Sequence, residues 1–266
     1  MELHDLATQV FHGTTLADKL VGLPHNLGAL TDTQRGAPRA WEAPGRSNAL
    51  QIAPKKARKP VPHLDSLVHA DMRARSLHTF ANHELMALEL CAWALLAWPD
   101  APPAFRRGLG WLIAEEQDHL RLYVERLERM GVSFGDQPLN DHFWRVAHQL
   151  ATPAQFVAAM SLTFEQANLD HAPTFARRFR EVEDLDSAAI LDQITEDEVR
   201  HVAFGARWLA NLSDPQTSLW DAYVANLTPY NSPQRACGKL IFNRAAREAA
   251  GLPADFIDRL AALEHP

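Results

Sequence analysis

The chain has 266 residues, enough for one large domain or two small ones. Its 47% hydrophobic and 22% charged residues are typical of a globular protein with a sizeable core, and only 12 Gly and 3 Tyr favour helix over sheet. No apolar run approaches the roughly 20 residues that cross a bilayer, the start "MELHDLATQV" differs from a secretory signal, and two cysteines make no disulfide framework. We therefore expect a cytoplasmic protein without a membrane partner.

Charge is spread unevenly along the chain. Residues 1–62 hold 8 Lys/Arg against 5 Asp/Glu, a balance of +3, and the remainder holds 18 against 28, a balance of −10, which together give the net charge of −7. The acidic remainder argues against a nucleic-acid-binding surface. The basic stretch "APKKARKP" (53–60) contains two prolines, and we expect it to be a solvated, extended connector rather than a phosphate-binding arm.

The first part of the chain predicts one short helix followed by irregular structure. Apolar residues near helical spacing predict an amphipathic helix over residues 4–22. From Pro24 to Pro62, glycine, proline and arginine recur without periodicity, so we expect an irregular segment that wraps over the surface. A loop of this length indicates a covering or functional role.

The clear helical signal begins near Asp65. Residues 65–98 predict one long helix, which the turn "PDAPP" ends, and residues 102–130 predict a second one that starts at a proline. These two long helices are therefore joined by a short turn, which is typical of an antiparallel hairpin. A further, short helix is expected over residues 142–150.

A second pair of long helices follows. Residues 153–180 predict the third helix, and Pro173 should kink it. Residues 186–211 predict the fourth helix, and the tail 214–266 supports two or three shorter ones.

These elements predict an all-α fold, an antiparallel four-helix bundle. We expect a single domain over residues 1–266. Its parts are an N-terminal helix with an extended covering segment (1–64), the bundle (65–212) and a C-terminal helical extension (213–266).

Two Glu-x-x-His pairs occupy the second and fourth predicted helices. Of the 13 histidines, two have a glutamate three residues earlier, which gives the pairs Glu116–His119 and Glu198–His201. Residues three apart lie on one face of a helix, so each pair can bind a common partner. Their placement on alternate helices of the bundle is more informative than their number.

The other two long helices each carry a lone acid in apolar surroundings. Glu84 precedes Glu116 by 32 residues, and Glu165 precedes Glu198 by 33. Measured from the turn between the first two helices, Glu84 and Glu116 lie at depths of about 22 and 20 Å, hence at one level. Glu89 lies five residues beyond Glu84, about 500° of rotation, and points elsewhere.

The chemistry of this set predicts metal binding. Four carboxylates and two imidazoles at one level of a core would repel one another, and buried carboxylates are costly unless they are paired or metal-bound. Two divalent cations would neutralise the four negative charges. A mixed set rich in carboxylates favours iron or manganese. Asp170 and His171, just beyond Glu165, stay open as further ligands.

The arrangement resembles the ferritin-like di-iron carboxylate superfamily, over residues 65–212. The stretches "HELMALEL", "DEVRHVAFG", "APGR" and "FNRAAREAAGL" resemble a bacterial ferritin-like family related to tRNA-modifying hydroxylases. The resemblance implies two iron ions, or manganese or mixed Mn/Fe, bound by the following residues: Glu84, Glu116, His119, Glu165, Glu198 and His201. It further implies that Asp197 and Glu115 orient the metal-bound histidines, and it raises a redox role for Tyr123.

The function that follows is an O2-dependent oxidoreductase that hydroxylates or oxidises a small organic substrate, with an electron-donor protein as a further partner. The segments outside the bundle favour this activity, because an iron store would not need them. Two other activities stay open: hydroxylation of a tRNA base, and iron binding or ferroxidase activity without an organic substrate. A helical scaffold with a vestigial site is a fourth alternative, and a homodimer is compatible with each.

Overall fold

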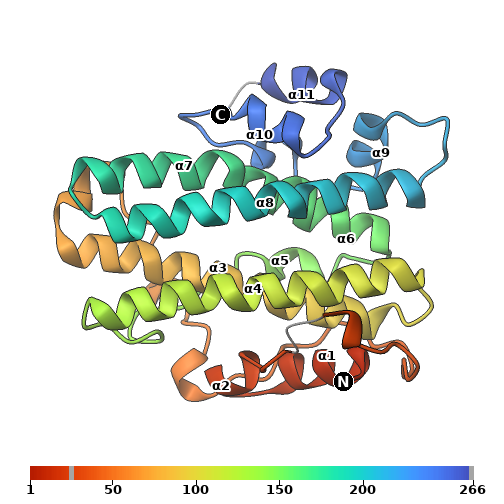
Figure 1. The fold of residues 1–266 in the computed structure, drawn as a ribbon, viewed down its shortest axis with the longest axis horizontal. Helices are drawn as coiled ribbons and strands as arrows, with labels where there is room; N and C mark the ends of the chain where they lie inside the picture. The colour runs from red at the N-terminus through yellow and green to blue at the C-terminus, as the bar shows by residue number, and fades with distance from the viewer. Residues whose placement is uncertain (24–26, 264–266) are drawn as a thin grey trace. The chain divides into compact units, whose positions relative to one another are not determined.

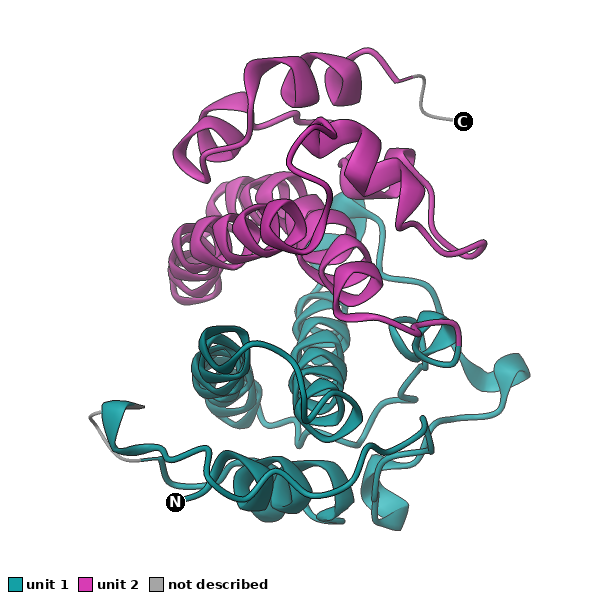
Figure 2. Cartoon of the chain, turned by 90° about the vertical axis from the view of Figure 1, so that its right-hand side faces the viewer, with its two compact units in different colours: residues 1–148 teal, residues 149–266 magenta. Residues whose placement is uncertain are grey.

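The computed structural model of the protein describes residues 1–23 and 27–263, and every regular element in these ranges is a helix. Two isolated bridges, Glu2–Thr31 and Ile52–Leu139, are the extended pairings within them. The all-α prediction is therefore confirmed. In the same ranges no helix combines the length and apolarity needed to cross a membrane. The chain divides into two compact units, residues 1–148 and 149–266 (Figure 2).

Unit 1 is built around a hairpin of two long helices, α3 (Ala70–Ala97) and α4 (Pro103–Arg129), which lie side by side (Figure 1). Proline at the first position of α4 suits a helix start, since its missing N–H would have no partner there. Gly131, just past the end of α4, has φ +75°, a conformation that favours glycine. Both helices match their predictions, except that residues 64–68 before α3 form a 3-10 helix.

The N-terminal region of unit 1 corrects one prediction. In place of one helix over 4–22 there are two, α1 (Leu3–His12) and α2 (Leu16–Lys19). The break has a local cause, because Thr15 and Asp18 form a reciprocal capping box that starts α2 anew. Helix α1 packs against α3.

The irregular segment over 24–62 is confirmed from residue 27 onward, while residues 24–26 lie outside the described residues. It contains three single-turn 3-10 helices, Leu27–Ala29, Asn48–Leu50 and Lys55–Ala57. The helix predicted over 142–150 is shorter, α5 (Trp144–Ala147).

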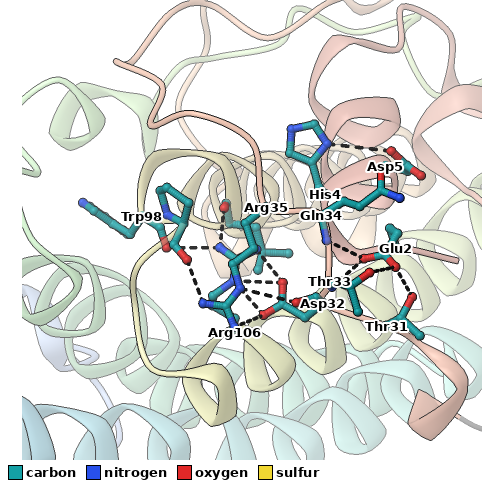
Figure 3. A network of polar contacts seen from close by, with 12 residues as sticks. Glu2, His4, Asp5, Thr31, Asp32, Thr33, Gln34, Arg35, Trp98 and Arg106 are labelled. Carbon is teal, nitrogen blue, oxygen red and sulfur yellow. Dashed lines mark hydrogen bonds and ion pairs between the residues drawn. The ribbon is translucent and has the colours of Figure 1, made fainter.

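A polar network fastens this segment to the α3–α4 turn, as Figure 3 shows. Asp32 accepts from the guanidinium of the fully buried Arg106 at 2.8–3.1 Å. The same guanidinium donates to the carbonyl oxygens of Leu95 (2.7 Å) and Trp98 (3.1 Å). These carbonyls belong to the end of α3, where the helix itself offers no donor. Arg106 of α4 therefore completes the end of α3, and Asp32 of the covering segment holds that arginine in place.

Unit 2 is built around a second hairpin, and its first arm is not a uniform α-helix. The arm consists of α6 (Pro153–Ala159), a π-helical turn (Met160–Glu165) and α7 (Gln166–Glu181). The second arm is α8 (Leu185–Leu212), close to its predicted range. The predicted single helix over 153–180 is thus interrupted by a π turn.

Pro173 lies inside α7, without ending it. A proline has no N–H, so the carbonyl oxygen of Leu169, four residues earlier, lacks its helical donor. The side-chain amide of Asn243 donates to that oxygen at 3.3 Å. A residue far along the chain thus replaces the missing helical bond.

The tail of unit 2 agrees with the prediction of short helices. Its elements are α9 (Leu219–Ala225), a 3-10 helix (Pro233–Ala236), α10 (Arg244–Ala249) and α11 (Ala254–Ala261). Helix α10 packs against α7 and α8, and α9 packs against α8. The tail therefore covers the second hairpin.

Candidate metal centre

Unit 1 brings three predicted ligands together, which we call the first triad: Glu84 on α3 and Glu116 and His119 on α4. One ligand atom from each lies within 4.8 Å of the other two. All three side chains are buried, at 4%, 1% and 0% exposure. Glu116 and His119 share a face of α4, with 3.9 Å between Oε2 and Nδ1. Two carboxylates and an imidazole therefore converge where water has little access.

Glu89, the competing acid on α3, has other partners. Its carboxylate accepts from Arg46 at 2.7 and 3.1 Å and lies 3.0 Å from the ammonium of Lys19. All three side chains are buried. Burial lowers the pKa of Lys19, and the adjacent Glu89 carboxylate opposes that shift. Five residues along a helix turn the side chain well away from Glu84, so Glu89 serves the covering segment instead of the triad.

Unit 2 contains a second triad of the same composition: Glu165 at the end of the π turn, and Glu198 and His201 on α8. Nδ1 of His201 lies 3.4 Å from Oε2 of Glu198 and 4.0 Å from Oε1 of Glu165. These side chains are 4%, 1% and 0% exposed. Asn168, on α7, donates from Nδ2 to Oε1 of Glu198 at 2.9 Å. One oxygen of Glu198 is thus held by an amide while the other faces the histidine.

The π turn and α8 approach each other closely at Gly205. A Cβ at this position would lie 2.3 Å from Cβ of Ser161, which no packing arrangement allows. Gly205 lies one turn beyond His201 on α8. The absence of a side chain therefore lets the helix that carries Glu198 and His201 lie directly against the turn that carries Glu165.

Asp170, left open as a further ligand, belongs to another cluster. Its carboxylate accepts from the guanidinium of Arg247 at 2.7 and 2.8 Å and from the backbone N–H groups of Gly238 (2.8 Å) and Asn243 (2.7 Å). Asp170 and Arg247 are both fully buried. Four hydrogen bonds satisfy this carboxylate without a metal.

The two acids that the resemblance implies as supports for the histidines, Asp197 and Glu115, lie on α8 and α4. Asp197 forms an ion pair with Arg200 on its own helix at 2.6 Å, and Glu115 is half-buried on α4. Their roles toward the histidines stay predictions. Tyr123 is buried one turn beyond His119, with its ring 6.0 Å from that of Phe80. A redox role for Tyr123 also stays a prediction.

The donor set of each triad fits a transition metal. Carboxylate oxygen and imidazole nitrogen together suit iron, manganese or zinc, and a majority of carboxylates favours the first two. With a neutral histidine, each triad carries two negative charges, which one divalent cation would balance. The burial of the six side chains makes such a balance necessary, because buried carboxylates are costly when they stay uncompensated.

Sequence reasoning missed the residues that hold these helices in place. Glu89 and Asp170 are each paired with an arginine, Arg46 and Arg247, that is 43 and 77 residues away along the chain. The available signal was that the two arginines lie in the stretches "APGR" and "FNRAAREAAGL". Asn168 gave no signal, because an isolated asparagine on a helix has many ordinary explanations.

The chain belongs to the family described as "Protein of unknown function (DUF455)", whose sequence profile matches residues 6–258. It is also similar to an "Uncharacterized protein" of Haemophilus influenzae, with 29% identity over 174 residues, which cover 62% of this chain and 58% of the relative. The matched region thus spans little more than half of that relative. No solved structure matches the chain significantly. Family membership brings no activity with it, so the function has to be inferred from the chemistry of the two triads.

Proposed function

We propose that this protein is a di-metal carboxylate oxidoreductase that uses O2 to hydroxylate or oxidise a small organic substrate. In this proposal the two hairpins form a ferritin-like four-helix bundle, and the two triads together bind two iron ions, or manganese in place of one or both. The proposal rests on the residue pattern of the sequence and on the geometry within each unit.

The observation that carries the proposal is that the same ligand set occurs twice. In each unit a lone glutamate on the first arm of a hairpin lies beside a Glu-x-x-His pair on the second arm. Each set is buried and would balance one divalent cation. One such cluster has ordinary structural explanations, but its repetition in the same order of helices favours a site for two metals.

The residues of the chain would divide the work as follows. His119 and His201 would bind metal in their neutral form, and the four glutamates would supply charge balance. Asn168 would keep one oxygen of Glu198 engaged, so that the other is directed to the metal. The bound metals would supply the redox chemistry of O2 activation. The buried position of the ligands would keep bulk water away from the reaction.

Metal analysis of the purified protein tests the proposal. After expression in iron- or manganese-supplemented medium, we expect about two transition-metal ions per chain, and anomalous diffraction at the two absorption edges would identify them. Glu116→Gln should lower the metal content, whereas Glu125→Gln, at an exposed glutamate of the same helix, should leave it unchanged. A wild-type protein that contains no transition metal would overturn the proposal.

Oxygen consumption separates the proposed activity from iron oxidation alone. An oxygenase or oxidase consumes O2 in proportion to an organic substrate, whereas a ferroxidase consumes it in proportion to added Fe(II).

The tRNA alternative receives less support from the structure, because Arg58 of the basic stretch forms an ion pair with Asp141 at 2.5 Å. Salt-dependent tRNA binding at low ionic strength would restore that alternative.

A further inference from the structure

The π turn that carries Glu165 is in contact with the C-terminal extension at more than one point. The backbone N–H of Gln166 donates to the carbonyl oxygen of Ser161, five residues earlier, which is the pattern of a π-helix. Such turns are rare and are frequently found at functional sites. Two side chains of the C-terminal extension, Arg247 and Tyr223, contact this turn or the residue that follows it.

Arg247 of α10 holds the C-terminal end of the turn. Its guanidinium forms a bidentate pair with Asp170 and donates to the carbonyl oxygen of Ala236 at 2.9 Å. With the Gln166 amide oriented so that Nε2 donates to the carbonyl oxygen of Leu162 (2.8 Å), its Oε1 accepts from Nε of Arg247 at 3.2 Å. Gln166 directly follows Glu165, so the arginine reaches the residue next to a proposed ligand.

Tyr223 of α9 holds the middle of the turn. Its hydroxyl lies 2.9 Å from Oγ1 of Thr163, and both side chains are fully buried. Because Thr163 donates its only hydroxyl proton to the carbonyl oxygen of Ala158 at 2.7 Å, Tyr223 must be the donor to Thr163. Burial raises the pKa of Tyr223, so the phenol keeps the proton that this bond needs.

We propose that the C-terminal extension is a positioning element that holds the π turn, and with it Glu165, through Arg247 and Tyr223. A buried ion pair is favourable only when both partners and their hydrogen bonds are in place. Arg247 finds its partners on α7 and on residues 236–243 together, so its burial requires a docked extension. Its role for the metal site rests on the proposed function, while its role for the π turn does not.

Hydrogen–deuterium exchange on the full-length protein tests the proposal. The double variant Arg247→Met/Asp170→Asn removes both charges of the pair at similar side-chain volume, and Tyr223→Phe removes one hydroxyl. We expect exchange of residues 160–166 to accelerate about tenfold or more in the double variant and less in Tyr223→Phe. The matched control is Arg244→Met on the same helix, where an exposed arginine pairs with Asp258, and exchange should stay unchanged.

A Co(II) titration adds a readout of the site itself. We expect the double variant to bind Co(II) about 10–100-fold more weakly, with an altered visible spectrum. If the double variant does not fold, Arg247→Lys keeps the charge but loses the bidentate geometry and should show the same changes to a smaller extent.

The outcomes distinguish the two proposals. If exchange of residues 160–166 stays unchanged while residues 233–252 are released, the pair only docks the extension, and the positioning role is wrong. If the wild-type protein binds no Co(II), iron or manganese, the proposed function fails. In that case the exchange of residues 160–166 still decides the positioning role.

Discussion

The two units support their lone glutamates with a similar device. In unit 1 the acid five residues beyond Glu84 is Glu89, paired with Arg46, and in unit 2 the acid five residues beyond Glu165 is Asp170, paired with Arg247. Five residues amount to about 500°, so both acids face away from their triads. Each flanking segment thus delivers an arginine to the back of the helix that carries the lone glutamate.

The difference lies in the helix itself. Glu84 lies within an uninterrupted α-helix of 28 residues, whereas Glu165 ends a π turn between two α-helical pieces. In unit 1 two cations, Lys19 and Arg46, pair with Glu89. In unit 2 Asp170 accepts from one arginine and two backbone N–H groups. A regular helix needs only to be covered. A π turn also needs contacts that keep it in its less common form, which the C-terminal extension of unit 2 is placed to provide.

The largest effect is expected from removing the buried acids. Glu89→Gln leaves Lys19 and Arg46 buried with no carboxylate, and we expect the free energy of unfolding to fall by about 3–5 kcal/mol. The loss for Asp170→Asn should lie at the low end of that range, because this variant leaves one buried cation, Arg247, without a carboxylate instead of two. Urea denaturation followed by circular dichroism measures both.

The control for these variants is Asp258→Asn, which breaks the exposed pair with Arg244. An exposed pair contributes at most about 1 kcal/mol. If Glu89→Gln costs no more than this control, the buried cluster of unit 1 contributes nothing particular to stability. If Asp170→Asn costs clearly more than Glu89→Gln, the order that we infer for the two units is reversed.

A second effect concerns the hydrogen bond that Asn168 donates to Glu198 in unit 2. Asn168→Leu keeps the volume of the side chain but removes the donor to Oε1 of Glu198. Since hydrogen bonds to metal ligands fix their orientation, we expect the affinity for Co(II) or Fe(II) to drop about 10–100-fold. Asn226→Leu, which removes an amide bonded to its own helix at the Ala222 carbonyl, is the matched control. Equal affinities in both variants would argue against a role for Asn168.

A third effect compares two glycines that lie on the second arms of the hairpins. Gly205→Ala places a Cβ 2.3 Å from Cβ of Ser161, whereas Gly110→Ala places one 2.5 Å from Cδ2 of Leu3, the end of a flexible side chain. We expect a loss of about 1–3 kcal/mol for Gly205→Ala. Gly110→Ala should be nearly neutral, because the gain of about 1 kcal/mol in helix propensity offsets a small rearrangement of Leu3. Thermal unfolding of the two variants distinguishes these cases.

The smallest effect is a pH dependence in unit 1. His78 is buried, and its Nε2 accepts from the backbone N–H groups of Gly135 (2.9 Å) and Gln137 (3.3 Å). Burial lowers its pKa from 6.5 to about 4. The unfolded chain therefore binds this proton first, and the stability from His78 is complete above pH 6.5 and decreases as the pH falls toward 4.

We expect a loss of about 1 kcal/mol between pH 7.5 and 5.5 from this histidine. Urea denaturation at both pH values measures the loss, and His78→Gln should reduce it by that amount. An identical pH dependence in the two proteins would contradict the assignment to His78.

The sequence predicted the elements of the fold better than their irregularities. Periodicity placed α3, α4 and α8 close to their observed bounds, and a proline marked the start of α4. The stretch "MSLTFE" reads as ordinary helix, because the choice between α and π geometry depends on contacts with Thr163 and Gln166 from distant residues. The break after α1 was signalled by Thr15 and Asp18, a capping box that helical spacing alone overlooked.

For the candidate site, spacing placed the residues of each triad but not their support. The separation of Glu84 from Glu116 follows from a short turn between two straight helices, so a level along the helix axis could be calculated. The pairings of Arg46 and Arg247 join residues 43 and 77 positions apart, and no local pattern encodes such contacts.

The direction of these pairings along the chain has a consequence for biosynthesis. Lys19 and Arg46 precede Glu89, so both cations have already been synthesised when that acid emerges from the ribosome. Arg247 follows Asp170 by 77 residues. Asn243, whose side-chain amide donates to the carbonyl oxygen of Leu169, follows its partner by a similar span. At about 5–20 residues per second, about 4–15 s pass between the synthesis of Asp170 and that of Arg247. We therefore expect the nascent chain to depend most on chaperones when its second hairpin has been synthesised and its C-terminal extension has not.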